Sequence, residues 1–190
     1  MDYLVEIEDR LIKATKALAE SSTLDHQQLL LKIALLIKSA FVENKTLLIF
    51  GNGGSASEAI HIAAEFTGKC VYEHEPWPAL ALSESPSALT AIPNDFEFVD
   101  VFKRQVQAFK AQAGIAWGLT TSGKSQNVLS ALEEAKRLGM TTVLFSSSRL
   151  GSDTEYPFVD FDMRAQSFST PRIQEIHLIW AHIICEIAEL

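Results

Sequence analysis

The sequence predicts a single α/β domain built on a parallel β-sheet with helices on both of its faces. From residue 45 onward, short apolar runs rich in Leu, Ile, Val and Ala alternate with longer amphipathic runs. Apolar runs of this kind are typical of strands that are buried on both faces, as in parallel sheets connected by helices. A length of 190 residues fits one domain with its own core. We expect residues 1–190 to form that domain, with residues 1–44 as a helical extension packed on it.

The composition excludes several classes of function. The 16 basic and 24 acidic residues give a net charge of −8, which is a poor match for nucleic acid or an anionic membrane. The apolar run at 29–37 contains Lys32 and is too short to cross a bilayer. Cys70 and Cys185 lack C-x-x-C spacing, which indicates reduced thiols. The acidic N-terminus is unlike a signal peptide, which begins with basic residues. We therefore expect a cytoplasmic protein.

The first forty residues predict two helices. The first is indicated by apolar residues at helical spacing, namely Leu4, Ile7, Leu11, Ala14 and Leu18. Ser21, Ser22 and Thr23 end that helix and offer N-cap hydroxyls to the next one, at 24–41. This second helix is apolar on almost every side. We expect it to pack both on the domain and on another subunit.

The elements that follow alternate between strands and helices. The sequence predicts strands at Thr46–Phe50, Ala79–Ser83, Ile115–Thr120, Thr141–Ser146 and Phe158–Met163. It predicts helices at Ser55–Phe66, Asp95–Phe109, Ser125–Leu138 and Thr170–Leu190. Gly139 follows the helix predicted at Ser125–Leu138, and glycine is favoured at the position directly after a helix. Ligands bind such sheets beyond the carboxyl ends of the strands.

A glycine-rich loop, Gly51 to Ser57, follows the first predicted strand. Its glycines allow a close approach of the backbone to a ligand, and the next helix directs free N–H groups at the same place. Ser55 and Ser57 add hydroxyl donors. The loop is neither G-x-G-x-x-G nor a Walker A motif, so a dinucleotide or nucleoside triphosphate is not the first expectation. The alternative is a tight turn in which Ser55 only caps the helix.

A second loop, Thr120-Thr121-Ser122-Gly123-Lys124-Ser125, lies between a predicted strand and a predicted helix. Four hydroxyls around one glycine form a compact array of neutral donors, and an N-cap needs only one of them. Two such loops at one edge of a sheet suit a phosphomonoester, whose oxygens accept many hydrogen bonds. Lys124 either adds charge to this site or is an ordinary solvated loop lysine.

Two pairs of polar residues on apolar helices are candidates for chemistry. His61 and Glu65 are four residues apart and therefore share one helix face. Burial raises the pKa of a carboxyl group, which suits a general acid or base, although the pair could also serve helix packing alone. On the last helix, Gln174 and His182 lie off the apolar stripe. His177 lies nearer that stripe and is expected to be a core histidine.

These four polar side chains together offer two nitrogens and two oxygens, a donor set that suits zinc. The proposed ligands are His61, Glu65, Gln174 and His182. Gln174 and His182 are separated by about 12 Å along one helix. Either Gln174 reaches along the helix, or the two ligands come from different subunits.

The loops and pairs above, with Asn94-Asp95-Phe96 and the segment Arg172 to His177, resemble the phosphoheptose isomerases over nearly the whole chain. These enzymes have the sugar-isomerase (SIS) fold. The resemblance implies a three-layer sandwich with a five-stranded parallel sheet, N-terminal helices that pack in a homotetramer, sites at the subunit interfaces and one zinc ion per subunit. It also implies isomerisation of sedoheptulose 7-phosphate to D-glycero-D-manno-heptose 7-phosphate through an enediol(ate), a step of heptose biosynthesis.

The resemblance also implies a role for each site residue. Phosphate-binding positions are Thr120, Thr121, Ser122 and Ser125. Sugar-contacting positions are Asn52, Gly53, Gly54, Asn94, Asp95 and Gln174, to which we add Ser55 for its hydroxyl and Glu65. The zinc ligands are His61, Glu65, Gln174 and His182. The catalytic base and acid are Glu65 and His182, which the family often draws from different subunits.

The sequence departs from the family's pattern in three places, and these leave the exact sugar open. Pro171 replaces a common acidic residue, Lys124 replaces a common Asn, and the stretch 146–155 lacks the usual paired glycines. Two alternatives also remain: a sugar-phosphate sensor, and a non-catalytic SIS protein of the kind that binds the replication initiator DnaA. Proteins of that kind lack the His61/Glu65 pair and the last histidine. The chain keeps all three, which favours the enzyme.

Overall fold

Five parallel strands form the centre of the structure, a computed structural model that describes residues 2–190. The strands are β1 (Thr46–Gly51), β2 (Ala79–Ala81), β3 (Ala113–Leu119), β4 (Thr141–Ser147) and β5 (Phe161–Ala165). Their order in the sheet is β2-β1-β3-β4-β5, and every neighbouring pair is parallel. This arrangement confirms the predicted fold class.

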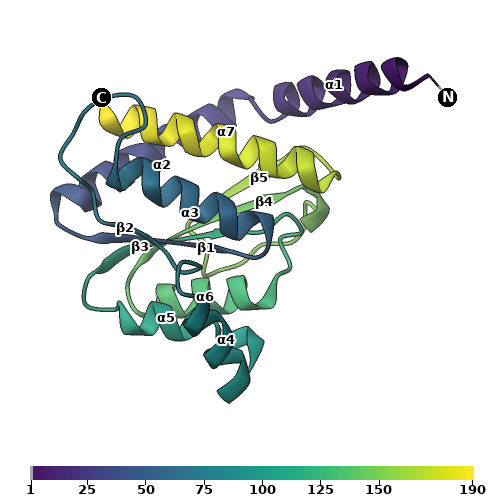
Figure 1. The fold of residues 1–190 in the computed structure, drawn as a ribbon. Helices are drawn as coiled ribbons and strands as arrows, with labels where there is room; N and C mark the ends of the chain where they lie inside the picture. Colours follow the sequence, from purple (N-terminus) through teal and green to yellow (C-terminus); the bar gives the residue numbers. More distant parts are fainter. Residues whose placement is uncertain (1) are drawn as a thin grey trace.

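Helices cover both faces of the sheet (Figure 1). One layer consists of α2 (Leu24–Val42), α3 (Gly54–Thr67) and α7 (Thr170–Glu189). The other consists of α4 (Pro86–Asp95), α5 (Lys103–Ala108) and α6 (Gln126–Arg137), with a short 3-10 turn at Phe98–Asp100. A second 3-10 turn, Ser148–Leu150, follows β4. The first helix, α1 (Tyr3–Glu20), extends away from the sheet. No helix among the described residues is both long enough and apolar enough to cross a membrane.

The strands are apolar throughout because both of their faces are buried. In β1, Leu47 and Ile49 pack in the layer with α2, α3 and α7, while Leu48 and Phe50 pack in the layer with α5 and α6. All four are at most 1% exposed. Burying one such side chain stabilises the fold by about 1.5–3 kcal/mol. The two-sided core holds the carboxyl ends of β1 and β3, which carry the two predicted loops, at one edge.

The N-terminal helices leave much apolar surface exposed. Only Ala17 of α1 is buried, whereas α2 packs through Ile33, Ile37 and Phe41 against the domain. The exposed apolar side chains of these two helices are Tyr3, Leu4, Val5, Ile7, Leu11, Ile12, Leu24, Leu31, Leu35 and Val42. Exposed apolar side chains in such number on two helices are typical of surfaces that contact another protein.

The helix predicted at Asp95–Phe109 is confirmed only at Lys103–Ala108, and its first half is wrong. The chain forms α4 instead, which ends at Asp95, and then a 3-10 turn before α5 begins at Lys103. The start signal for α4 is Ser85, whose side chain accepts a hydrogen bond from the Ala88 N–H, followed by Pro86 in the first turn. The remaining boundaries agree within three residues; β2 ends before Ser83 and β5 begins after Phe158.

Candidate active site

The glycine loop and the hydroxyl loop meet at the carboxyl edge of β1 and β3. A side chain at Gly51 would lie 2.8 Å from the Leu119 carbonyl oxygen, so the adjacent strand ends can approach this closely only with glycine there. Gly53 has a φ of +56°, which glycine adopts readily. The side-chain amides of Asn52 and Asn127 donate to each other at 2.8 Å in both directions, which ties the glycine loop to the first turn of α6.

The hydroxyl loop forms one connected array. Thr120 Oγ1 lies 2.8 Å from Ser125 Oγ and 3.3 Å from Ser122 Oγ. Ser125 is the N-cap residue of α6, but its side chain makes no capping hydrogen bond. The N-terminus of α6 therefore directs backbone N–H groups to the same place as the hydroxyls, as in anion sites at helix N-termini. Lys124 is exposed to solvent.

A carboxylate and two imidazoles converge at the far end of α3. His61 Nε2 lies 2.9 Å from His182 Nε2 and 3.3 Å from Glu65 Oε1. One ligand atom from each of the three residues lies within 4.8 Å of the others. Two imidazole nitrogens and one carboxylate oxygen are the three protein ligands of many catalytic zinc sites. The structure thus brings together three of the four predicted ligands, and the donor set fits a divalent metal ion.

The fourth predicted ligand, Gln174, lies elsewhere in the same chain. A side chain at Gly54 would overlap the Gln174 amide, so this amide packs directly against the glycine loop. Gln174 and His182 belong to the same helix, about 12 Å apart along its axis. Gln174 therefore lies beside the glycine loop of its own chain and does not join His182.

Asn94 and Asp95 are both exposed at the end of α4. The Asn94 amide donates to the Asp95 carboxylate at 2.8 Å. The hydrogen bonds of the described residues do not link this pair to either loop. Pro171 occupies the first turn of α7, where a proline is well tolerated.

His177 is a core residue, as predicted. It is fully buried, and its Nε2 lies 2.8 Å from the Ser146 carbonyl oxygen, to which it donates. Burial lowers the pKa of His177 to about 4, so the ring is neutral near pH 7. A neutral buried ring that serves packing takes no part in proton transfer at the site.

Glu58, which lies one turn before His61 on α3, is not among the residues predicted from the sequence. Its two carboxylate oxygens are buried and have no hydrogen-bond partner among the described residues. Burial raises the pKa of Glu58 to about 7. The spacing in the sequence could have indicated it, because Glu58 lies three or four residues from Gly54 and His61 and shares a helix face with them and with Glu65.

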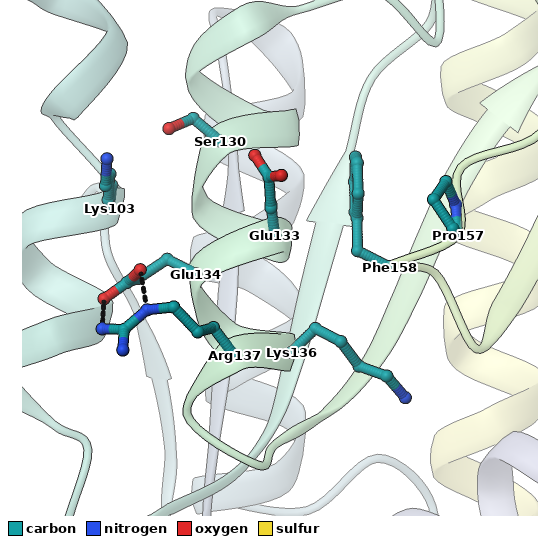
Figure 2. A pocket seen from close by; sticks show the side chains of 8 residues that line it. All are labelled: Lys103, Ser130, Glu133, Glu134, Lys136, Arg137, Pro157 and Phe158. Carbon is teal, nitrogen blue, oxygen red and sulfur yellow. Dashed lines mark hydrogen bonds and ion pairs between the residues drawn. The ribbon is translucent and has the colours of Figure 1, made fainter.

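A cavity of about 530 Å³ between α5, α6 and the segment before β5 lies outside this site (Figure 2). None of the predicted site residues lines it. Its buried carboxylate, Glu134, accepts hydrogen bonds from Arg137, which lower the pKa of Glu134 to about 2. The three basic groups at this cavity, Lys103, Lys136 and Arg137, each lie within 4.0 Å of a carboxylate.

The sheet, the loops at its carboxyl edge and the convergent carboxylate define a sugar-isomerase-type protein. In agreement, the family model described as "SIS domain" matches residues 10–147. Curated proteins named phosphoheptose isomerase are similar over most of their length. The one from Crocosphaera subtropica is 46% identical over 154 residues, which cover 81% of this chain and 78% of the relative. The one from Thermodesulfovibrio yellowstonii is 38% identical over 188 residues, which cover 97% of this chain and 92% of the relative.

Among solved structures, a phosphoheptose isomerase from Francisella tularensis superimposes with a TM-score of 0.88. It is 27% identical, and the match covers 100% of this chain and 99% of that one. The chain belongs to the phosphoheptose isomerase family.

Proposed function

We propose that this chain isomerises sedoheptulose 7-phosphate to D-glycero-D-manno-heptose 7-phosphate, a step of heptose biosynthesis. The observation that carries this proposal is the convergence of Glu65 with His61 and His182 from two different helices. The names of the curated relatives support the same activity.

The reaction moves a proton between two neighbouring carbons, and Glu65 and His182 supply the required groups. Glu65 removes a proton from C1 while His182 protonates the carbonyl oxygen on C2, which gives a 1,2-enediol. Glu65 then returns its proton to C2, and the C1 hydroxyl gives its proton back to His182 as the aldehyde forms. General acid–base catalysis of this kind contributes about 10²–10⁴-fold to the rate.

We propose one zinc ion per chain, held by His61, Glu65 and His182, with Gln174 of a second copy as the fourth ligand. When bound, such an ion would supply positive charge for the oxygen that becomes negative in the enediolate. Carboxylate oxygens bound to a cation are weaker bases, so the ion would orient Glu65 more than it would strengthen it as a base.

The two loops hold the parts of the substrate that do not react. In this proposal the phosphate binds the hydroxyls of Thr120, Thr121, Ser122 and Ser125. The sugar hydroxyls are contacted by Asn52, Gly53, Gly54, Ser55, Asn94, Asp95 and Gln174. Binding energy from the phosphate then positions C1 and C2 at Glu65.

The length of α3 favours a site that is built by two copies of the chain. Glu65 lies eleven residues after Gly54 on α3, or about 16 Å along the helix axis. From C2 of the sugar to the phosphorus there are seven bonds of about 1.5 Å, so the substrate spans less than ~11 Å. We propose that the loops of one chain and Glu65 of another form the site, as the family resemblance also implies. The exposed apolar faces of α1 and α2 provide the contact for a homotetramer.

Mixing two inactive variants tests the shared site. One variant carries Glu65→Gln, and the other carries Thr120→Val and Ser125→Ala. If the site combines residues of two copies, mixed oligomers recover part of the activity because some sites contain both intact halves. If each chain builds its own site, the mixture remains as inactive as its components.

Incubation with sedoheptulose 7-phosphate tests the activity itself. We expect aldoheptose 7-phosphate to form, observed by NMR, and unphosphorylated sedoheptulose to react far more slowly because it lacks the phosphate contacts. Binding of sedoheptulose 7-phosphate without any product would contradict the isomerase and indicate a sensor or a non-catalytic relative.

A further inference from the structure

The segment between β4 and β5 lies directly against the hydroxyl loop. We name residues 147–156 the β4–β5 strap. It overlaps the stretch 146–155, in which the sequence lacks the paired glycines expected from the family resemblance. Three of its side chains contact the loop.

Two strap hydroxyls bind backbone carbonyls of the loop. Ser147 Oγ donates to the Thr121 carbonyl oxygen at 2.6 Å, and the Tyr156 hydroxyl donates to the Gly123 carbonyl oxygen at 2.9 Å. The third contact is Leu150, whose Cδ1 lies 2.9 Å from where a side chain at Gly123 would begin. Gly123 itself has a φ of +69°, so both its conformation and its surroundings require glycine.

These two hydrogen bonds fix the direction of two peptide groups in the loop. In a planar trans peptide, the N–H points opposite to the C=O. With the Thr121 carbonyl turned toward the strap, the Ser122 N–H points away from the strap. The Gly123 carbonyl likewise points toward the strap, so the N–H of Lys124 points away from it. This N–H donates to Ser122 Oγ at 3.1 Å. The strap thus directs donors to the side of the loop where the hydroxyls gather.

The strap is itself anchored to β5. The Arg164 guanidinium donates to the carbonyl oxygens of Gly151 and Thr154 at 2.8 and 2.6 Å. The Asp162 carboxylate accepts from Arg164 Nε at 2.7 Å. The Tyr156 ring stacks on Phe158, with ring centroids 5.3 Å apart. Burial raises the pKa of Tyr156, which keeps its hydroxyl protonated as a donor.

We propose that Tyr156 and Ser147 are positioning residues that hold the hydroxyl loop in the conformation that binds the substrate phosphate. This inference rests on the proposed function, because it assigns the phosphate to that loop. Neither residue touches the reacting carbons, so both act on substrate affinity through the loop backbone. The strap is therefore a determinant of phosphate recognition that lies outside the loop.

Tyr156→Phe removes one hydroxyl and keeps the stacked ring. We expect the dissociation constant for inorganic phosphate, measured by calorimetry, to rise about five- to tenfold, since a carbonyl in the loop loses its donor. The KM for sedoheptulose 7-phosphate should rise by a similar factor with kcat within twofold. The matched control is Tyr72→Phe, an exposed tyrosine outside the strap, which should leave all three values unchanged.

Phosphate affinity within twofold of the wild type in Tyr156→Phe would overturn the inference, as would a wild type that does not bind phosphate. Ser147→Ala decides the question if Tyr156→Phe does not fold, because it removes the other donor and should weaken phosphate binding in the same way. Phosphate binding is measured without turnover. A wild type that binds phosphate but makes no aldoheptose contradicts the proposed function alone.

Discussion

The Nε2 atoms of His61 and His182 lie 2.9 Å apart, although 121 residues separate them in the sequence. His61 lies on α3 and His182 on α7, and these helices run side by side from the same edge of the sheet (Figure 1). Two imidazole nitrogens at this distance either share one proton or bind a common cation. Glu65 Oε1, 3.3 Å from His61 Nε2, supplies the negative charge that favours a cation.

Removing one imidazole should weaken metal binding. We expect His61→Asn and His182→Asn each to lower the affinity for Zn²⁺ at least about 100-fold, because each removes a direct ligand. Titration with Co²⁺, followed by its visible spectrum, reports the same loss. His74→Gln, at a histidine outside the three-residue group, should bind metal like the wild type. Equal Zn²⁺ affinity in all four proteins would show that the group does not hold an ion.

The contact between Gly54 and Gln174 predicts a second effect. Gly54→Ala places a methyl group where the Gln174 amide lies, and the flexible side chain has to move. We expect kcat/KM for sedoheptulose 7-phosphate to fall about tenfold, with the free energy of unfolding changed by less than ~1 kcal/mol. In a double-mutant cycle with Gln174→Ala, the two losses should not add, since both changes remove the same contact. Full additivity would contradict this explanation.

Glu189 fixes the end of α3 to the end of α7. Its side chain is 1% exposed, and its carboxylate accepts hydrogen bonds from the backbone N–H groups of Cys70, Val71 and Tyr72 at 2.7, 2.9 and 2.8 Å. His74 Nε2 lies 3.3 Å from the same carboxylate. Burial alone would raise the pKa of Glu189, but these donors outweigh it and hold the pKa below the ordinary 4.5.

Because the pKa of Glu189 is lower in the folded chain than in the unfolded one, its stabilising effect is complete above about pH 4.5 and is lost as the pH falls further. We expect Glu189→Gln to lower the free energy of unfolding at pH 7 by about 1–3 kcal/mol. Between pH 5 and 3, urea denaturation should show a smaller loss of stability in this variant than in the wild type. Glu186→Gln, at an exposed position of the same helix, should retain the wild-type pH dependence.

The sequence predicted those parts of the structure that depend on local pattern. Buried strands gave continuous apolar runs, and the spacing of His61 and Glu65 placed them on one helix face. The first half of the helix predicted at Asp95–Phe109 was wrong because Ser85 and Pro86 start a separate helix that ends at Asp95. Contacts between distant segments, such as Tyr156 with Gly123 or Gln174 with Gly54, depend on how the elements pack. No local pattern encodes that packing.

The central claim is that Glu65 transfers the proton, and aldoheptose 7-phosphate formation by Glu65→Gln tests it most directly. We expect kcat to fall about 10²–10⁴-fold, while sedoheptulose 7-phosphate still binds through the two loops. Glu133→Gln, at an exposed glutamate on α6, serves as the matched control and should retain full activity. Turnover by Glu65→Gln at a rate close to the wild type would contradict the claim.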